Sequence, residues 1–388
     1  MVLLGCLALP IWLYLLLGRG MFWRARPRDL DLADAPAPVI WPRVVAVVPA
    51  RNEAEVLPSS VGALLAQRYP GHFDIVVVDD QSSDDTAAVA ARAAELRNQT
   101  GRLTVLSGTP LLPGWAGKLW AMEQGLAAVD RRGEPPDYIL FTDADIACGP
   151  DVLARLVAAA EQRQAALVSL MATLRCESLA ERLLVPAFVF FFQKLFPFAW
   201  VNDPASATAA AAGGCMLVRR AALKRAGGLA KIRGAIIDDC ALGALMKRQG
   251  PVWLGLGTEV HSLRPYPAFA DIRRMVTRSA YAQLGYSAWR LVGAVLGMLL
   301  TYMAAPLLAI FAHGAAQLLG GLTWLLMTLA YLPMLRFYGR SPLWAPLLPA
   351  IALFYTVYTV ESAAQHARGR GGAWKGRYQA TSQGSHAR

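Results

Sequence analysis

Two aspartates one residue apart, Asp143 and Asp145, follow an apolar run in the segment YILFTDADI, residues 138–146. A buried strand that ends in two carboxylates places both of them at the rim of a sheet. Mg²⁺ and Mn²⁺ take oxygen ligands and retain waters or substrate phosphates, so one or two protein carboxylates are enough to hold them. We therefore predict that Asp143 and Asp145 bind a divalent cation, Mg²⁺ or Mn²⁺.

A second set of acids follows another apolar run, in VVVDDQSSDDT, residues 76–86. Asp84 and Asp85 are explained as capping residues at the start of a helix, but Asp79 and Asp80 are not. A carboxylate at the end of a strand can accept hydrogen bonds from a base or a ribose hydroxyl, as in dinucleotide-binding folds. We predict that Asp80 has this role.

A third acid pair, Asp238–Asp239, opens the segment DDCALGALMKRQG. Acids at the start of a helix are stabilised by the helix dipole, which is one sufficient explanation. Next to a metal and a diphosphate, a carboxylate there could also remove the proton from an acceptor hydroxyl. Both interpretations remain open from the residues alone, as does the choice between Asp238 and Asp239.

Two basic residues and a glycine pair complete the candidate site. Lys118 in GWAGKLWAM and Arg278 in RRMVTRSAY could neutralise a departing diphosphate, although each could equally be solvated surface. Gly213 and Gly214 precede the strand-like run CMLVRR. Glycines allow a close approach of the backbone to a ligand, and they also simply form turns. We place this pair on the acceptor side.

Strand-like and helix-like patterns alternate through residues 42–289 and predict an α/β domain. Short apolar runs lie at residues 44–48, 74–80, 103–106 and 137–143, with helical stretches such as 84–99 between them, the latter capped by Ser83 or Asp84. Such alternation is typical of a Rossmann-like, mostly parallel sheet with helices on both faces. Ligands bind beyond the carboxyl ends of the strands in this architecture, so the acids should converge on one edge.

The composition indicates association with a membrane. The chain of 388 residues is 55% hydrophobic with a mean hydropathy of +0.36 and a net charge of +11. A basic chain with long apolar runs favours an anionic membrane surface, and we expect no nucleic-acid partner. The five cysteines are scattered, without the spacing of a zinc site, so we expect reduced thiols in a cytoplasmic domain and no zinc.

Apolar segments flank the predicted domain. Residues 1–23 are predicted to form a transmembrane anchor, followed by a linker over residues 24–41 that begins with arginines. Because positive charge follows this apolar run, the N-terminus should lie outside and the domain in the cytoplasm. Within the domain, residues 183–201 form another apolar stretch, predicted to be a helix in the membrane interface near the acceptor, or alternatively a buried core helix.

The C-terminal region, residues 290–361, contains three apolar stretches, each long enough to cross a bilayer. Three crossings would place the basic tail, residues 362–388, outside the cell, whereas its positive charge should keep it inside. Either one stretch is re-entrant or the tail is an exception to the rule. We favour a cytoplasmic tail.

Taken in order, the motifs VVPARNE, VVVDDQSSDDT, GWAGK, TDADI, GGCMLVRR and IIDDCALGALMKRQG resemble those of family 2 glycosyltransferases with the inverting GT-A fold. The resemblance covers residues 43–280. The flanking apolar segments, GWAGKLWA and the terminal WKGR are similar to a narrower group, the hopene-associated glycosyltransferases of bacterial hopanoid gene clusters. Carotenoid-type and ceramide-type glucosyltransferases share much of this pattern.

The resemblance implies a role for each residue of the donor site. Pro49 and Glu53 would line the nucleotide pocket, and Asp80 would contact the base. Asp143 would contact the ribose or the metal, and Asp145 would be the metal ligand.

The resemblance also bears on the transfer itself. Asp239 matches the catalytic base of the family's Glu-Asp pair, with Asp238 in place of the glutamate. The family's Q/R-x-x-R-W signature is imperfect, because Arg278 is followed by Ser279 and Met275 stands where Gln or Arg is expected. This departure argues against a processive polysaccharide synthase and leaves the role of Arg278 at the diphosphate open.

Together these features predict a multi-pass enzyme of the bacterial inner membrane that transfers a sugar from a UDP-sugar to a lipid hydroxyl, a hopanoid being the specific candidate. One rival is a phosphatase-like hydrolase with Asp143 as nucleophile and Asp145 as general acid. Such enzymes carry Thr or Val where this chain has Ala147, and their motif comes earlier in the chain. The other rival is a membrane scaffold that retains the fold without catalysis.

Overall fold

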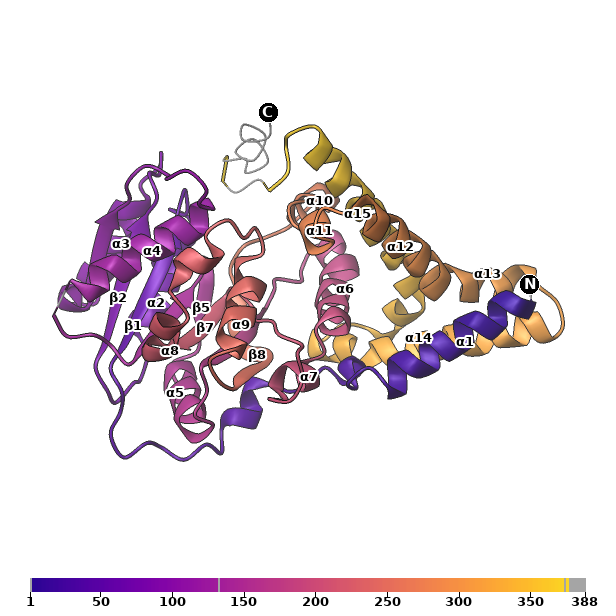
Figure 1. Ribbon diagram of the computed structural model, residues 1–388, viewed down its shortest axis with the longest axis horizontal. Helices are drawn as coiled ribbons and strands as arrows, with labels where there is room; N and C mark the ends of the chain where they lie inside the picture. The colour runs from indigo at the N-terminus through magenta and orange to yellow at the C-terminus, as the bar shows by residue number, and fades with distance from the viewer. Residues whose placement is uncertain (1, 132, 373–374, 377–388) are drawn as a thin grey trace.

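The computed structural model describes residues 2–131, 133–372 and 375–376. An α/β domain occupies one side of the molecule, and the N-terminal and C-terminal apolar helices form a wedge on the other side (Figure 1). Helix α6 stands between these two parts (Figure 1). The two ends of the sequence therefore contribute to one helical layer beside the domain that they flank.

An eight-stranded sheet in the order β3-β2-β1-β4-β7-β6-β8-β5 forms the centre of the domain. Its strands are β1 (Val44–Ala50), β2 (Phe73–Asp79), β3 (Leu103–Ser107), β4 (Tyr138–Thr142), β5 (Ile146–Cys148), β6 (Leu167–Thr173), β7 (Cys215–Arg219) and β8 (Val252–Ser262). The four strands predicted from the sequence are confirmed and run parallel to one another. The sheet is mixed, because β7 runs antiparallel to β4 and β6, and β5 runs antiparallel to β8.

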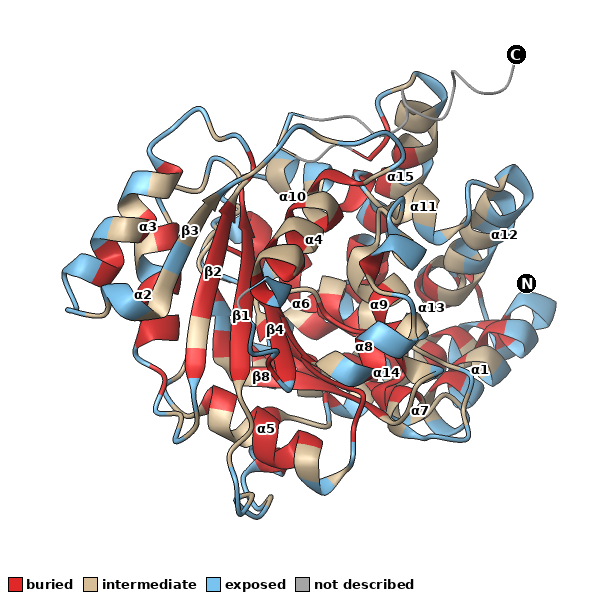
Figure 2. Ribbon diagram, turned by 60° about the vertical axis from the view of Figure 1, so that its left-hand side comes forward, coloured by how far each residue is buried: buried red, intermediate tan, exposed pale blue. Residues whose placement is uncertain are grey.

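Helices cover both faces of this sheet, as predicted. Val45 and Val47 of β1 pack with α4 in one core, and Val44 and Ala46 pack with α2, α3 and α5 in another. Strand β1 is buried throughout, and Figure 2 shows it in the middle of the domain. The helices of this domain are α2 (Leu57–Leu65), α3 (Thr86–Glu95), α4 (Gly117–Asp130), α5 (Val152–Gln162), α8 (Arg220–Arg225) and α9 (Asp238–Lys247), with the 3₁₀ turns η2 (Asp29–Leu32), η3 (Thr100–Arg102) and η4 (Leu229–Ile232).

The predicted start of α3 is corrected by one residue. Asp85, rather than Ser83 or Asp84, occupies the N-cap position, and its side chain makes no capping hydrogen bond. The carboxylate of Asp84 instead accepts from the amide of Thr86 at 3.1 Å and from that of Ala54 at 3.2 Å. The acid therefore stabilises the helix start and the preceding loop from one position earlier.

The remaining helices are mainly apolar. They are α1 (Val2–Leu17), α6 (Leu179–Leu195), α7 (Phe198–Asn202), α10 (Phe269–Thr277), α11 (Ala280–Gln283), α12 (Ala288–Met298), α13 (Ala304–Phe311), α14 (Ala315–Phe337) and α15 (Leu348–Ala367), with the 3₁₀ turns η1 (Phe22–Arg24) and η6 (Pro342–Leu347). A π-helical turn, Leu299–Met303, joins α12 to α13. The three segments Ala288–Phe311, Ala315–Phe337 and Pro342–Ala367 are long and apolar enough to cross a membrane. Helix α1, with 16 residues, is about 24 Å long and so shorter than a bilayer core of about 30 Å.

The apolar stretch predicted at residues 183–201 is two helices instead of one. Helix α6 begins earlier, at Leu179, where Ser178 and Glu181 form a capping box. It continues through Pro186 and ends at Leu195. Pro197 separates it from α7, because proline cannot continue a preceding helix without losing a backbone hydrogen bond.

Both ends of the last apolar unit, Pro342–Ala367, lie beside the α/β domain. Before it, the ring of Phe337 lies under Arg28, 5.2 Å from the guanidinium carbon. Inside the unit, near its end, Ser362 of α15 donates to the carbonyl oxygen of Thr277 in α10 at 2.6 Å. Farther along, Nζ of Lys375 lies 2.9 Å from Oε1 of Glu53. Trp374 and Arg377 of the WKGR motif, and residues 378–388 of the basic tail, lie outside the described residues.

Candidate active site

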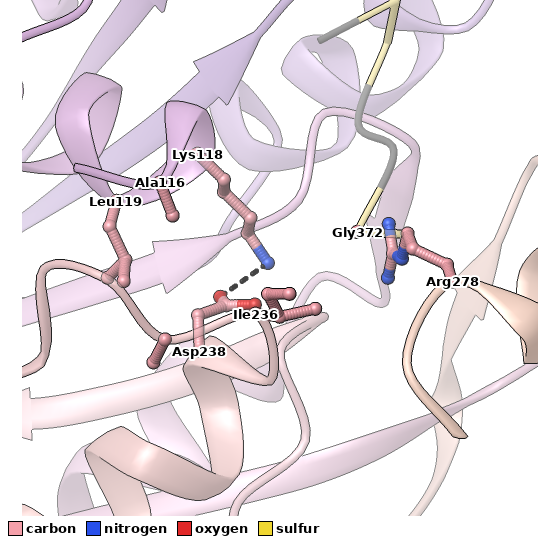
Figure 3. A pocket seen from close by; sticks show the side chains of 8 residues that line it. Ala116, Lys118, Leu119, Ile236, Asp238, Arg278 and Gly372 are labelled. Carbon is pink, nitrogen blue, oxygen red and sulfur yellow. Dashed lines mark ion pairs between the residues drawn. The ribbon is translucent and has the colours of Figure 1, made fainter. Parts of the chain in front are cut away.

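Lys118 joins two of the acid pairs. It is the second residue of α4, and its Nζ lies 2.7 Å from Oδ1 of Asp143 and 2.9 Å from Oδ2 of Asp238 (Figure 3 draws the second pair). Asp143 follows β4, and Asp238 opens α9. Residues that are separated by up to 120 positions therefore meet at the carboxyl edge of the sheet, where the strand pattern predicted Asp143 but did not place Lys118 or Asp238.

Asp239 is held by the backbone around it. Its Oδ2 accepts a hydrogen bond from the amide of Gly213 at 3.0 Å, and its Oδ1 accepts one from the amide of Cys240 at 2.7 Å. A Cβ atom on Gly213 would lie 3.1 Å from Nζ of Lys118 and 3.4 Å from Oδ2 of Asp239. The glycine thus allows the chain before β7 to approach both charged groups closely.

Asp145 is positioned by two residues at the end of β8 that the sequence analysis did not single out. Ser262 donates to Oδ2 of Asp145 at 2.9 Å, and Nε of Arg264 lies 3.3 Å from the same oxygen. Nη2 of Arg264 also reaches Oε1 of Glu53 at 2.6 Å. The sequence held a signal for both residues, because Ser262 ends the long strand β8 and Arg264 follows it.

The residues predicted to contact the nucleotide lie beside this centre. Pro49 is buried within β1, opposite Val78 of β2. Asp80 is fully buried and its amide donates to the carbonyl oxygen of Ala50 at 2.8 Å. Glu53 connects this region to Asp145 through Arg264. Pro49, Glu53 and Asp80 are not among the described residues that line the two cavities below.

Burial and like charges disturb the titration of the acids. Burial, together with Asp145 and Asp238, raises the pKa of Asp143 to about 6, although Lys118 opposes this shift. Burial and the neighbouring Asp238 also raise the pKa of Asp239. Burial alone would lower the pKa of Lys118, but Asp143 and Asp238 outweigh it and raise that pKa. Perturbed carboxylates of this kind gather at functional sites.

A cavity of about 430 Å³ opens from these groups. Its charged end is lined by the predicted site residues Lys118, Asp143, Asp145, Gly213, Gly214, Asp238, Asp239 and Arg278. Its apolar end is lined by side chains of α6, α12 and α15, including Phe188, Phe191, Phe192, Val295, Met298 and Tyr355. A second, small cavity of about 20 Å³ lies between Lys118, Asp238, Arg278 and Gly372 (Figure 3).

The charges of this centre fit a divalent cation. Among the described residues, no cluster of three or more His, Cys, Asp or Glu side chains has the arrangement of a metal site. A cation would therefore depend on two carboxylates plus water and substrate phosphate, as Mg²⁺ and Mn²⁺ commonly do. Two groups of ion pairs lie here, Lys118 with Asp143 and Asp238, and Arg264 and Lys375 with Glu53 and Asp145. Fully ionised, these groups and Asp239 together carry two more negative than positive charges.

Comparison with known proteins identifies a family and relatives that this chain resembles. Residues 42–282 match the model of the family described as "Glycosyltransferase like family 2". An N-acetylglucosaminyltransferase of Rhizobium leguminosarum bv. viciae is 34% identical over 116 residues, which are 30% of this chain. The match spans about a quarter, 24%, of that relative's length.

A solved structure resembles most of the chain. The mannosyltransferase PcManGT from Pyrobaculum calidifontis, in complex with GDP-Man and Mn²⁺, aligns with a TM-score of 0.57 at 19% identity. The alignment covers 92% of this chain and 99% of that one, so the likeness includes the flanking helices. At this identity the likeness establishes the fold, and the predicted Rossmann-like GT-A fold is confirmed, with a mixed sheet where a mostly parallel one was predicted.

Proposed function

The chain belongs to the glycosyltransferase-like family 2, and from this premise we propose that it transfers a sugar from a nucleotide-sugar, expected to be a UDP-sugar, to the hydroxyl of a membrane lipid. The observation that carries the proposal is the cavity of about 430 Å³, whose charged end with the acids continues into its apolar end. The N-acetylglucosaminyltransferase and mannosyltransferase relatives agree with a sugar-nucleotide donor.

On the donor side, Glu53 and Asp80 would contact the nucleoside, with Pro49 shaping the strand behind them. Asp145 and Asp143 would hold Mg²⁺ or Mn²⁺, which supplies charge for the diphosphate when bound. The presence of Mn²⁺ and GDP-Man in the Pyrobaculum enzyme supports a divalent cation here. Lys118 and Arg278 both line the small cavity and would stabilise the negative charge that develops on the leaving diphosphate.

In the transfer step, the lipid hydroxyl oxygen attacks the anomeric carbon as the bond from that carbon to the diphosphate breaks. The bonding electrons leave with the nucleoside diphosphate, and the hydroxyl proton passes to Asp239. We assign the base to Asp239 because Asp238 is already paired with Lys118, whereas Asp239 has a raised pKa and is fixed by Gly213. A base with a raised pKa accepts a proton more readily near neutral pH.

A lipid acceptor is supported by the helices that form the apolar end. Helices α12 and α15 belong to segments that are apolar and long enough to cross a membrane. Large apolar side chains are exposed on the outer surface of this layer, including Trp289, Leu296, Phe311 and Leu318. A hopanoid alcohol is the specific candidate that the sequence resemblance supplies.

We further propose that the enzyme lies in the bacterial inner membrane with its α/β domain in the cytoplasm. Because Phe337 before the unit Pro342–Ala367 lies against Arg28 of the linker, and Lys375 after the unit pairs with Glu53 of the domain, a re-entrant path is favoured for this unit. The ion pair of Lys375 with Glu53 supports a C-terminal tail on the cytoplasmic side. This path would remove the conflict between three crossings and a basic tail.

Donor binding by the purified protein tests the proposed chemistry first. Isothermal titration with UDP and GDP, with and without Mn²⁺, should show metal-dependent binding of one of them. Asp145→Asn should abolish the dependence on metal, and a panel of the matching nucleotide-sugars then identifies the sugar. Failure of every nucleotide to bind, or binding that ignores both metal and Asp145→Asn, would contradict the proposal.

A further inference from the structure

A cation, Lys194, lies in the wall of the apolar end of the cavity, near the last turn of α6. Its Nζ donates a hydrogen bond to the hydroxyl of Tyr302 at 2.9 Å and lies 3.9 Å from the sulfur of Met298. The ring centroids of Tyr302 and Phe191 are 4.7 Å and 5.4 Å from it. Within the described part of the chain, no carboxylate forms an ion pair with Lys194.

Burying the charged ammonium group of Lys194 lowers the stability of the folded protein. A charged group among apolar side chains is destabilising unless an opposite charge accompanies it. Two aromatic rings and one hydroxyl offset part of this cost through cation–π contacts and a hydrogen bond. Ionisable residues of this kind in a membrane-associated helical layer usually mark a binding site or pathway. An anion bound in the cavity would supply the opposite charge that Lys194 lacks.

Arg19 and Trp200 mark the level at which Lys194 lies. Nε and Nη2 of Arg19 donate to the carbonyl oxygens of Lys194 and Leu195 at 3.1 Å and 3.3 Å. The guanidinium carbon of Arg19 is 4.9 Å from the ring of Trp200. An arginine just after an apolar helix, beside a tryptophan, is typical of the membrane–water interface. Lipid phosphates lie at this level, and basic pockets between helices there bind anionic head groups.

The partner of Lys194 comes from an unusual backbone. Tyr302 belongs to the π-helical turn Leu299–Met303, which interrupts the long helical segment between α12 and α13. Its ring packs edge-on against Trp12 at 5.7 Å and Phe191 at 5.5 Å. Single π-helical turns inside longer helices are frequent at functional sites. Here the turn contributes the hydroxyl that holds the ammonium group of Lys194.

We propose that the acceptor is a lipid that carries a phosphate group, and that Lys194 binds this phosphate while the acceptor hydroxyl lies at Asp239. Both residues line the same cavity. The inference rests on the proposed transfer to a lipid, but it narrows the acceptor to phosphate-bearing lipids and so argues against the hopanoid alcohol named above as the specific candidate. A neutral hopanoid alcohol would leave Lys194 without a counter-ion.

Lipids with and without a phosphate test this inference with the full-length protein in detergent micelles. Phosphatidylglycerol has hydroxyls and a phosphate, whereas diacylglycerol has a hydroxyl alone. The variants are Lys194→Met and Lys194→Arg, with the exposed Lys224→Met on α8 as matched control. The readouts are kcat and KM for each lipid, and donor binding, which reports whether the variants are folded.

We expect the wild type to have a lower KM for phosphatidylglycerol than for diacylglycerol, or for a hopanoid alcohol. Lys194→Met should raise the KM for phosphatidylglycerol about 10- to 100-fold, the usual effect of losing a hydrogen bond to a charged group, and leave donor binding unchanged. Lys194→Arg and Lys224→Met should retain the preference. Equal use of the three lipids, or an equal effect of Lys194→Met on all of them, would overturn the inference while leaving transfer to a lipid intact.

A binding experiment covers the case in which none of these lipids accepts sugar. Dodecyl phosphate should bind the wild type more tightly than dodecanol, and Lys194→Met should abolish this difference. If the two compounds bind equally to the wild type, Lys194 does not recognise phosphate. If dodecyl phosphate is preferred but no lipid accepts a sugar, the anion site stands and the proposed transfer falls.

Discussion

The charged end of the cavity and its apolar end are held in place in different ways. At the charged end, short ion pairs and backbone amides fix each carboxylate, as Lys118 does for Asp143 and Asp238. At the apolar end, α12 has no buried residue, and its inner face lines the cavity while Leu296 on the other face is exposed. The first end is built for fixed geometry, and the second for apolar contact with a bound molecule.

This difference corresponds to the two substrates of the proposed reaction. Stabilisation of the transition state needs charged groups that are held in place before the substrate arrives. Holding them there is unfavourable for the folded protein, because like charges are buried close together. Recognition of an apolar chain depends on the apolar surface area that is buried more than on precise geometry. Changes at the charged end should therefore reduce kcat, and changes at the apolar end should raise the KM for the acceptor.

The largest effect is expected at the base. Asp239→Asn should lower kcat about 10²- to 10⁴-fold, because the hydroxyl loses its proton acceptor. Donor binding should be unchanged, since Asn keeps the shape of the side chain and its one amide oxygen can still accept from the amide of Gly213, although the hydrogen bond from Cys240 is lost. Release of the nucleoside diphosphate measures the rate, and Asp151→Asn, at an exposed ion pair with Arg68, is the control. Retention of full activity in Asp239→Asn would remove this residue from the mechanism.

The next effect is expected at the shared cation. Lys118→Met should lower kcat about 10²- to 10³-fold by removing a charge from the diphosphate site. It should also lower the free energy of unfolding by about 1.5–3 kcal/mol, because Asp143 and Asp238 lose their half-buried, hydrogen-bonded partner. Adding Asp238→Asn should restore part of the stability but not the activity. Denaturant unfolding of both variants checks this; unchanged stability in Lys118→Met would show that the pairs are not formed in solution.

A smaller effect is expected from pH. The pKa of Asp143 is raised to about 6, mainly by burial. A metal binds the ionised carboxylate, so affinity for Mn²⁺ should be constant above about pH 7 and fall as pH drops through 6. The fall should approach tenfold per pH unit, as for one proton displaced by one metal. Titration calorimetry of the wild type between pH 5 and 8 measures it, and Asp143→Asn should remove the step. A flat profile in the wild type would exclude Asp143 as a ligand.

The smallest effect is expected at the apolar end. Phe188→Leu removes part of an aromatic surface in the cavity and should raise the KM for the lipid about fivefold, with kcat nearly unchanged. Phe311→Leu is a matched control, because that side chain is 66% exposed on the outer surface. A fall in kcat in Phe188→Leu that is as large as the rise in KM would contradict the separation of the two ends into a catalytic end and an acceptor-binding end.

The sequence predicted the charged end better than the apolar end for a physical reason. Parallel strands all end at one edge, so Asp80, Asp143 and Asp145 could be placed together from the strand pattern alone. Arg264 was missed because β8 is the last strand of the domain, and its register was not predicted. Asp239 could not be separated from Asp238, because the choice depends on which carboxylate meets Lys118 and which meets Gly213.

The apolar end had no comparable signal. Its walls come from α6, α12 and α15, which are far apart in the sequence, and apolar residues at helical spacing have the same pattern whether they face a lipid, a core or a cavity. The π-helical turn at Leu299–Met303 and the contact of Lys194 with Tyr302 depend on how these helices pack. The sequence predicted one helix over residues 183–201, although Pro197 marks the break between α6 and α7, and it did not predict the start of α6 at Leu179 after the cap Ser178.

Transfer of a labelled sugar into the lipid phase tests the central claim most directly. The purified protein in lipid nanodiscs would be incubated with Mn²⁺ and a labelled nucleotide-sugar, and the label extracted into organic solvent. We predict that label enters the lipid phase with the wild type and Asp151→Asn, and not with Asp239→Asn or without Mn²⁺. Label that stays in the aqueous phase with every donor and every lipid tested would contradict transfer to a lipid.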